Sequence, residues 1–147
     1  MRRSDRLEPV QKIVDDTERR LAEHLAASER LLNGCEQKLI ELTGYRDDYT
    51  KGFAHRAGQG MGAREVMDYQ AFMSRLNEAI TQQSDIVERA RADRDAQLKL
   101  WQAAAQRSKA LTHVIENWEH QERRELDRRE QVESDERAQR PRAIVHE

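Results

Sequence analysis

The spacing of apolar residues constrains this chain more than any other feature of its sequence. In the first part of the chain, apolar or small residues recur with gaps of three and four residues, which is typical of the buried seam of a coiled coil. These residues are Leu7, Val10, Val14, Thr17, Leu21, Leu25, Ser28, Leu32, Cys35, Leu39, Leu42, Tyr45, Tyr49 and Phe53. The pattern predicts a helix over about residues 7–53, and Pro9 places its start near residues 6 to 8 because proline is tolerated only in a first turn.

A glycine-rich segment interrupts the pattern, which then resumes. Four of the six glycines fall within "GFAHRAGQGMGA", and their access to positive φ predicts a chain reversal over about residues 54–63. The second series predicts a helix over about residues 64–140, which Pro141 ends, followed by a flexible tail over 141–147. Its members are Tyr69, Met73, Leu76, Ile80, Gln83, Val87, Ala90, Arg94, Gln97, Trp101, Ala104, Ser108, Leu111, Ile115 and Trp118.

The two series match when the chain folds back on itself. A turn near residue 58 brings Leu111 opposite Leu7, Trp101 opposite Val14, and Tyr69 opposite Tyr49. Two prolines, 5% aromatic and 37% charged residues are also typical of long helices and not of a packed globule. The sequence therefore predicts an all-α fold, an antiparallel two-helix coiled-coil hairpin that forms one long rod over residues 1–140, with the second helix longer than the first.

In this alignment, residues 115–140 have no partner in the first helix. Four acid-before-base pairs spaced four apart support that segment as helix, each by about 0.2–0.5 kcal/mol. They are Glu119 with Arg123, Glu125 with Arg129, Glu133 with Arg137 and Glu136 with Arg140. Two interpretations stay open: a solvated charged helix, or a segment in which Trp118, Leu126, Val132 and the arginines enter a partner.

Composition argues against several classes of function. The 26 basic and 28 acidic residues nearly cancel, so there is no electrostatic footprint for nucleic acid. No run of about 18 apolar residues occurs, so we expect neither a signal peptide nor direct membrane insertion, and a cytoplasmic protein. Cys35 is the only cysteine, which excludes an intramolecular disulfide, and we expect it to be a small buried side chain.

No catalytic, cofactor or metal site is predicted. His113, Glu116 and His120 share one helical face, but no second cluster of ligands stands nearby in the sequence. A two-helix rod offers no pocket that excludes water, so we expect no enzyme activity.

The stretch "YQAFMSRLNEAITQQ", residues 69–83, carries more apolar surface than one helix seam needs. At about 100° per residue, Leu76 lies in the sector that faces the first helix, whereas Phe72 and Ala79, with Gln83 nearer the boundary, lie to one side. Surplus apolar surface on a polar helix is typical of a protein contact. A wider core packed under the loop is the alternative.

Several segments, in order, carry a family resemblance: "RLEPV", "YRDDY", the glycine loop, "YQAFMSRLNEAITQQ", "WQAAAQRSKAL" and "ERRELDRREQVESDERAQR". Together they resemble the FliJ family of the bacterial flagellar type III export apparatus over residues 1–140. The chain departs from the family after "KAL", where an acidic and basic run is usual and "THVIENW" stands here.

The resemblance implies a non-enzymatic coiled coil, similar to the central stalk of rotary ATPases, that sits in the pore of the hexameric export ATPase. It also implies contact with the cytoplasmic region of the membrane export gate and with export chaperones, at the inner membrane of the flagellar base. The gate contact maps to Phe72, Leu76, Ala79 and Gln83, the last of which is commonly a histidine. The ATPase contact maps to the end that carries both termini, with Trp118, Arg123, Arg124, Arg128 and Arg129.

Three other functions remain open on the sequence. The first is the analogous stalk of a virulence type III secretion system. The second is a dedicated export chaperone that binds one secreted client. The third is a generic homodimeric coiled-coil scaffold, which would be a dimer where the hairpin predicts a monomer.

Overall fold

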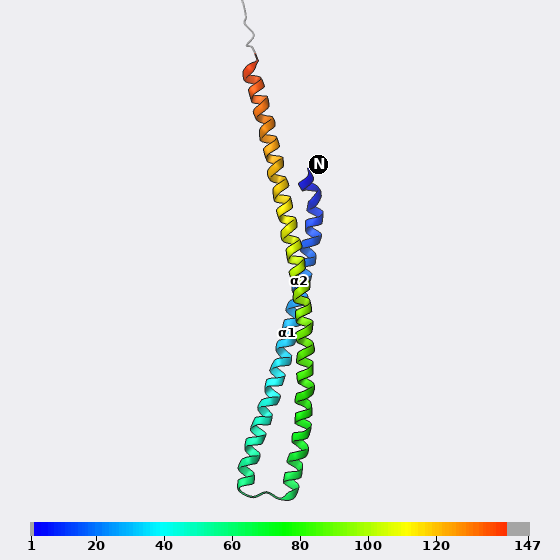
Figure 1. Ribbon diagram of the computed structural model, residues 1–147, viewed down its shortest axis with the longest axis vertical. Helices are drawn as coiled ribbons and strands as arrows, with labels where there is room; N and C mark the ends of the chain where they lie inside the picture. The colour runs from blue at the N-terminus through cyan, green and yellow to red at the C-terminus, as the bar shows by residue number, and fades with distance from the viewer. Residues whose placement is uncertain (1, 141–147) are drawn as a thin grey trace, which may run out of the picture. The chain divides into compact units, whose positions relative to one another are not determined.

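A computed structural model describes residues 2–140, and these contain two helices and no strand. Helix α1 spans Arg3–Gly58 and helix α2 spans Ala63–Gln139 (Figure 1). Residues 59–62 join them. The all-α fold with a longer second helix is confirmed, and the predicted tail over residues 141–147 lies outside the described residues.

Contacts divide the chain into two compact units. The loop unit comprises Arg19–Gln102, and the terminal unit comprises the residues up to Glu18 together with those from Ala103 onward. The single domain over residues 1–140 stays a prediction.

In the loop unit, α1 and α2 run antiparallel around a thin core. Leu32 and Val87 are each 4% exposed, and with Ala90 they form a cluster against which Cys35 and Leu39 pack. These residues all belong to the predicted seams. The described residues include no large side chain below 2% exposure, as expected where only two helices bury each other. The seam is therefore the main source of hydrophobic stabilisation in this unit.

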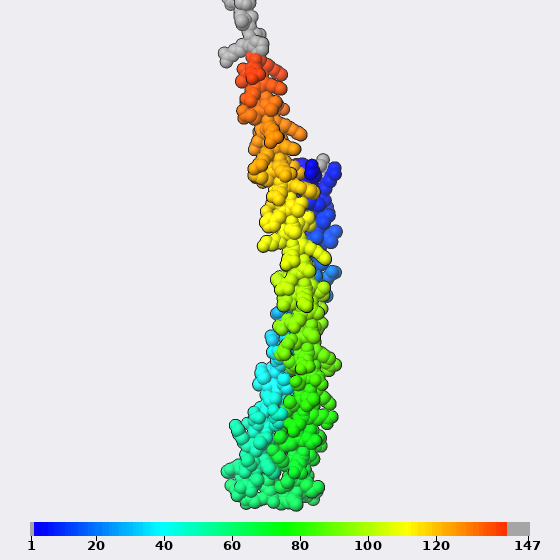
Figure 2. All heavy atoms as spheres, viewed as in Figure 1, coloured from blue at the N-terminus to red at the C-terminus, as the bar shows by residue number. Residues whose placement is uncertain are grey.

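In the terminal unit, the start of α1 lies against the second half of α2. Ser4 and Ala104 are buried there, and the Ser108 hydroxyl donates to the Asp15 carboxylate at 2.6 Å. Beyond Glu122, every described residue of α2 is exposed, and Figure 2 shows this end of α2, in orange and red, without a neighbouring segment.

Helix α1 is longer than predicted at both ends. It begins at Arg3, before Pro9, because the backbone amide of Ser4, which has no acceptor within α1, donates to Glu122 in α2. This hydrogen bond offsets the backbone hydrogen bond that Pro9 cannot donate. It continues to Gly58 because Gly60 is the only residue within 2–140 with positive φ, 95°, and because the basic residues His55 and Arg56 favour a helix C-terminus. The loop is therefore shorter than the predicted residues 54–63.

The pairing of the two helices also differs from the prediction. Tyr49 meets Tyr69 as predicted, but Asp15 contacts Ser108 and Ser4 contacts Glu122, so α1 meets residues further along α2 than expected. The turn centre lies later than residue 58, which shifts the pairing. The segment without an α1 partner therefore begins after Glu122, not at residue 115.

Candidate partner-binding surfaces

Four aromatic rings from both helices gather near the loop. Phe53 and Tyr69 stack with their ring centroids 3.7 Å apart, and Tyr49 and Phe72 stack at 4.3 Å. Tyr49 and Tyr69, with centroids 6.2 Å apart, connect the two pairs. Stacked aromatic pairs contribute about 0.5–1.5 kcal/mol beyond their buried area. This aromatic cluster therefore holds α1 against α2 next to the loop, while Tyr49 keeps 39% of its surface exposed.

The four predicted gate-contact residues separate into two kinds. Leu76 is 8% exposed, as expected for a residue that faces α1. Gln83, a member of the predicted seam that was also placed at the edge of the patch, is 5% exposed, and its Nε2 donates to the backbone carbonyl of Cys35 at 2.9 Å. Phe72 and Ala79 are half-buried. The surface available to a partner on this side therefore comes from Phe72 and Ala79, with Leu76 and Gln83 behind it.

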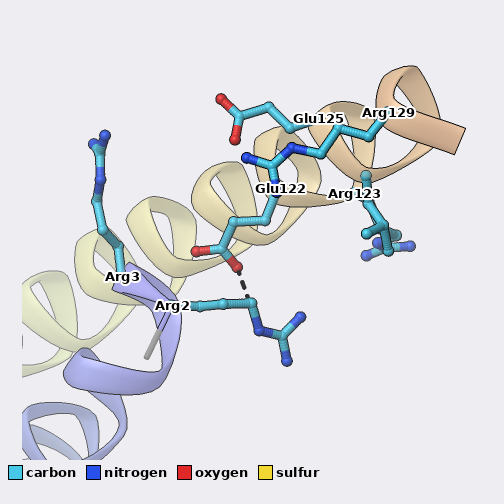
Figure 3. Close-up of a pocket in the computed structure, with 7 residues that line it drawn as sticks. Arg2, Arg3, Glu122, Arg123, Glu125 and Arg129 are labelled. Atoms are coloured by element: carbon cyan, nitrogen blue, oxygen red, sulfur yellow. Dashed lines mark ion pairs between the residues drawn. The ribbon is translucent and has the colours of Figure 1, made fainter. Parts of the chain in front are cut away.

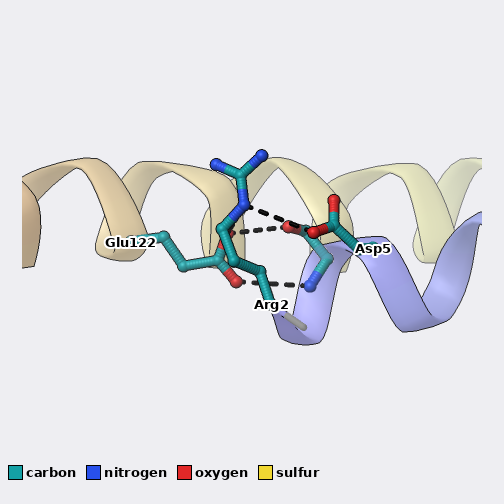
Figure 4. Close-up of polar contacts among 4 residues, drawn as sticks. Arg2, Asp5 and Glu122 are labelled. Carbon is teal, nitrogen blue, oxygen red and sulfur yellow. Dashed lines mark hydrogen bonds and ion pairs between the residues drawn. The ribbon is translucent and has the colours of Figure 1, made fainter.

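The carboxylate of Glu122 caps the start of α1. It accepts from the Ser4 hydroxyl at 2.7 Å and from the Ser4 backbone amide at 3.3 Å, and Arg2 lies 3.9 Å from it (Figure 4). The Ser4 amide is one of the free N–H groups of the first helical turn, which are stabilised by an acceptor of negative charge. The hydrogen bond from the Ser4 hydroxyl, reinforced by the Ser4 amide and Arg2, lowers the pKa of Glu122, while burial and Asp5 oppose the change.

A groove rich in arginine lies beside this contact. Its volume is about 350 Å³. Figure 3 shows the Arg2–Glu122 ion pair within it and the side chain of Arg129 running back along α2. The residues that line it are Arg2, Arg3, Glu122, Arg123, Glu125, Leu126 and Arg129. We call it the arginine groove.

The predicted ATPase-contact residues are distributed around this groove. Trp118 is half-buried, and the guanidinium of Arg3 lies 5.6 Å from its ring centroid, a cation–π contact within the chain. Arg123 and Arg129 line the groove, whereas Arg124 does not. Arg128 and Val132 line an adjacent depression, which shares Glu125 and Arg129 with the groove. Of the four predicted acid-base pairs, Glu133 and Arg137 form an ion pair at 3.7 Å.

Sequence reasoning missed the contribution of the N-terminal residues. Arg2, Arg3 and Ser4 belong to none of the predicted sites, yet they contact Trp118 and Glu122. The available signal was the run "RRSD", whose charges are unusual at the beginning of a helix that prefers acidic residues. Its partner could not be found without the correct helix pairing.

Within residues 2–140, no group of three or more His, Cys, Asp or Glu side chains is arranged to hold a metal ion. No helix in this described range is long and apolar enough to cross a membrane.

The family model described as "Flagellar FliJ protein" matches residues 3–142. The chain belongs to the FliJ family. Members of this family are non-enzymatic components of the flagellar type III export apparatus. The resemblance stated from the sequence is thereby confirmed, over nearly the range predicted.

One solved structure supports the fold. It is described as a putative YscO homolog, CT670, from Chlamydia trachomatis, and this FliJ-family chain matches it with a TM-score of 0.65 and 21% sequence identity. The match covers 90% of this chain and 91% of the other, so the two-helix fold is shared along nearly the full length of both. No curated protein matches the chain.

Proposed function

We propose that this FliJ-family chain is a central-stalk-like coiled coil of the flagellar export apparatus. It binds and promotes the hexameric export ATPase, and it links the ATPase to the cytoplasmic region of the export gate and to export chaperones. It works in the cytoplasm, peripherally associated with the inner membrane at the flagellar base. The observation that carries the proposal is the family match over residues 3–142, which spans both candidate surfaces.

The gate contact is assigned to the loop unit. Phe72, which stacks on Tyr49, and Ala79 offer half-buried apolar surface, and Leu76 and Gln83 support this surface from within the seam. A rigid aromatic and apolar surface is suited to protein binding because little side-chain entropy is lost on contact. Leu76 and Gln83 then act by holding the surface in shape.

The ATPase contact is assigned to the terminal unit. There, α2 continues past α1 as an exposed helix that carries Arg123, Arg124, Arg128 and Arg129, with Trp118 at its base. A single helix that reaches into a ring presents charged groups to several subunits at once, and it can bias the equilibrium between their states. Such coupling needs no chemistry from the stalk itself.

The test is to measure ATP hydrolysis and hexamer fraction of the purified export ATPase with and without this protein. We expect both to rise, because a stalk that binds the assembled ring favours the hexamer by mass action. No rise in either would refute the ATPase role. Pull-down of secreted clients without the ATPase would support the dedicated chaperone instead.

The proposed gate contact is tested with a matched pair of variants on α2. Ala79→Glu puts a charge on the proposed surface, and Ala71→Glu puts the same charge on an exposed position of the same helix. We expect Ala79→Glu to weaken binding to the gate's cytoplasmic region by roughly tenfold or more, because an unpaired carboxylate would be desolvated there. ATPase stimulation should persist in both variants. Equal gate binding by the two would remove the surface from the proposal.

A further inference from the structure

The arginine groove has a positive charge that the rest of the chain does not share. Four of its lining residues are arginines and two are glutamates, in a chain whose formal net charge is −2. The N-terminus of α1 lies at the same place, since Arg2 and Arg3 belong to the groove. The partial positive charge of a helix N-terminus adds to that of the guanidinium groups.

Two of these arginines have no acidic partner within the described residues. Glu122 is occupied by Ser4 and Arg2. Within residues 2–140, no ion pair within 4.0 Å is formed by Arg123 or Arg129. Leu126, between them on the helix, is 55% exposed. The groove thus combines unpaired guanidinium groups with an exposed apolar side chain.

The groove also lies where α1 stops and α2 continues. Figure 2 shows α2 extending past the blue start of α1 with no segment beside it. A second helix lying along this part of α2 would continue the packing that α1 provides up to Ser4. Its carboxylates could pair with Arg123 and Arg129, because guanidinium and carboxylate groups form strong, directional pairs.

The glutamates decide between classes of anionic partner. Glu122 and Glu125 lie among the arginines, and they would repel a continuous row of phosphates, as in nucleic acid or an anionic bilayer. A protein helix carries its charges singly, so it can present carboxylates to the arginines and an apolar residue to Leu126. We propose that the arginine groove binds an acidic helical segment of a partner protein. This rests on the proposed function, because the partner to be tested is the export ATPase.

The experiment compares two double variants of the full chain with equal changes in charge. Arg123→Glu with Arg129→Glu alters the groove, and Arg107→Glu with Lys109→Glu makes the same change of charge at exposed positions of the same helix, outside both the groove and the proposed ATPase contact. We expect the groove variant to weaken ATPase binding by roughly tenfold or more and the control by less than about threefold. In the groove variant the new carboxylates would directly face the carboxylates of the bound segment, whereas in the control they lie away from it. Circular dichroism checks that both variants keep the helix content of the wild type.

A photo-crosslinking residue in place of Leu126 identifies the bound segment. We expect a crosslink to a stretch of the ATPase that is helical and rich in Asp or Glu. A crosslink to a neutral or basic stretch, or to a second copy of this chain, would overturn the proposal.

The remaining outcomes separate the two proposals. If wild-type protein binds the ATPase and both double variants lose affinity equally, the groove is refuted while the ATPase role stands. If the wild type does not bind the ATPase, both are lost. Vesicles of phosphatidylglycerol test the last alternative. If the groove variant alone loses binding to these vesicles, while its binding to the ATPase is unchanged, the groove binds a bilayer and our proposal is refuted.

Discussion

At the scale of residues, Glu122 stabilises a helix other than its own. Its carboxylate accepts two hydrogen bonds from Ser4 at the start of α1, where the helix has no acceptors of its own. Gln83 has a similar role in the loop unit, because it bonds the Cys35 carbonyl across the seam. Both contacts use a polar side chain to specify which residues of α1 and α2 face each other.

The Glu122 contact predicts a dependence of stability on pH. The pKa of Glu122 is lowered on folding, so its contribution to stability is present above its ordinary pKa of 4.5 and is lost as the pH falls through the lower value of the folded protein. In urea unfolding at neutral pH, Glu122→Gln should be less stable than the wild type. At a pH below the lowered pKa of Glu122 in the folded protein, the two should converge. Glu125→Gln, at an exposed position, serves as the control, and a difference for Glu122→Gln that persists in acid would contradict the prediction.

At the scale of elements, helix α1 contains glycines that its own packing does not require. A Cβ atom built at Gly34 or Gly44 would meet no atom within 4 Å, and neither residue has positive φ. Glycine in a helix interior costs about 0.5–1 kcal/mol relative to alanine. Gly60 differs, because its φ of 95° ends the turn after α1.

We therefore predict that Gly34→Ala stabilises the protein by about 0.5–1 kcal/mol in urea unfolding followed by circular dichroism. Gly60→Ala is the matched control and should destabilise it, because alanine at positive φ is strained. A loss of stability for Gly34→Ala would show that a neighbour approaches this position more closely than the described structure does.

At the scale of the whole molecule, the apolar seam of each helix is used within the chain. In the loop unit, Leu32 and Val87 bury each other, and Phe53 and Tyr69 stack across the helices. A homodimer built on the same seams would have to replace these contacts. We therefore predict that the purified protein is a monomer of 17.3 kDa by light scattering. A concentration-independent dimer mass would favour the homodimeric scaffold.

The sequence alone determined that the chain forms two helices, that these run antiparallel, and that the chain belongs to the FliJ family. Gaps of three and four residues repeat along both halves, and this local pattern suffices because an apolar stripe must be buried wherever it occurs. It also predicted that Leu76 faces α1 and that Tyr49 meets Tyr69.

Only the tertiary structure decided where each helix begins and which residues of the two helices meet. Ser4 and Glu122 lie 118 residues apart in the chain, so no local pattern could show that one caps the helix of the other. The same holds for the hydrogen bond from Gln83 to the Cys35 carbonyl and for the arginine groove, whose residues come from both ends of the chain. In a coiled coil many pairings bury the stripes almost equally well, and the polar contacts between distant residues select one of them.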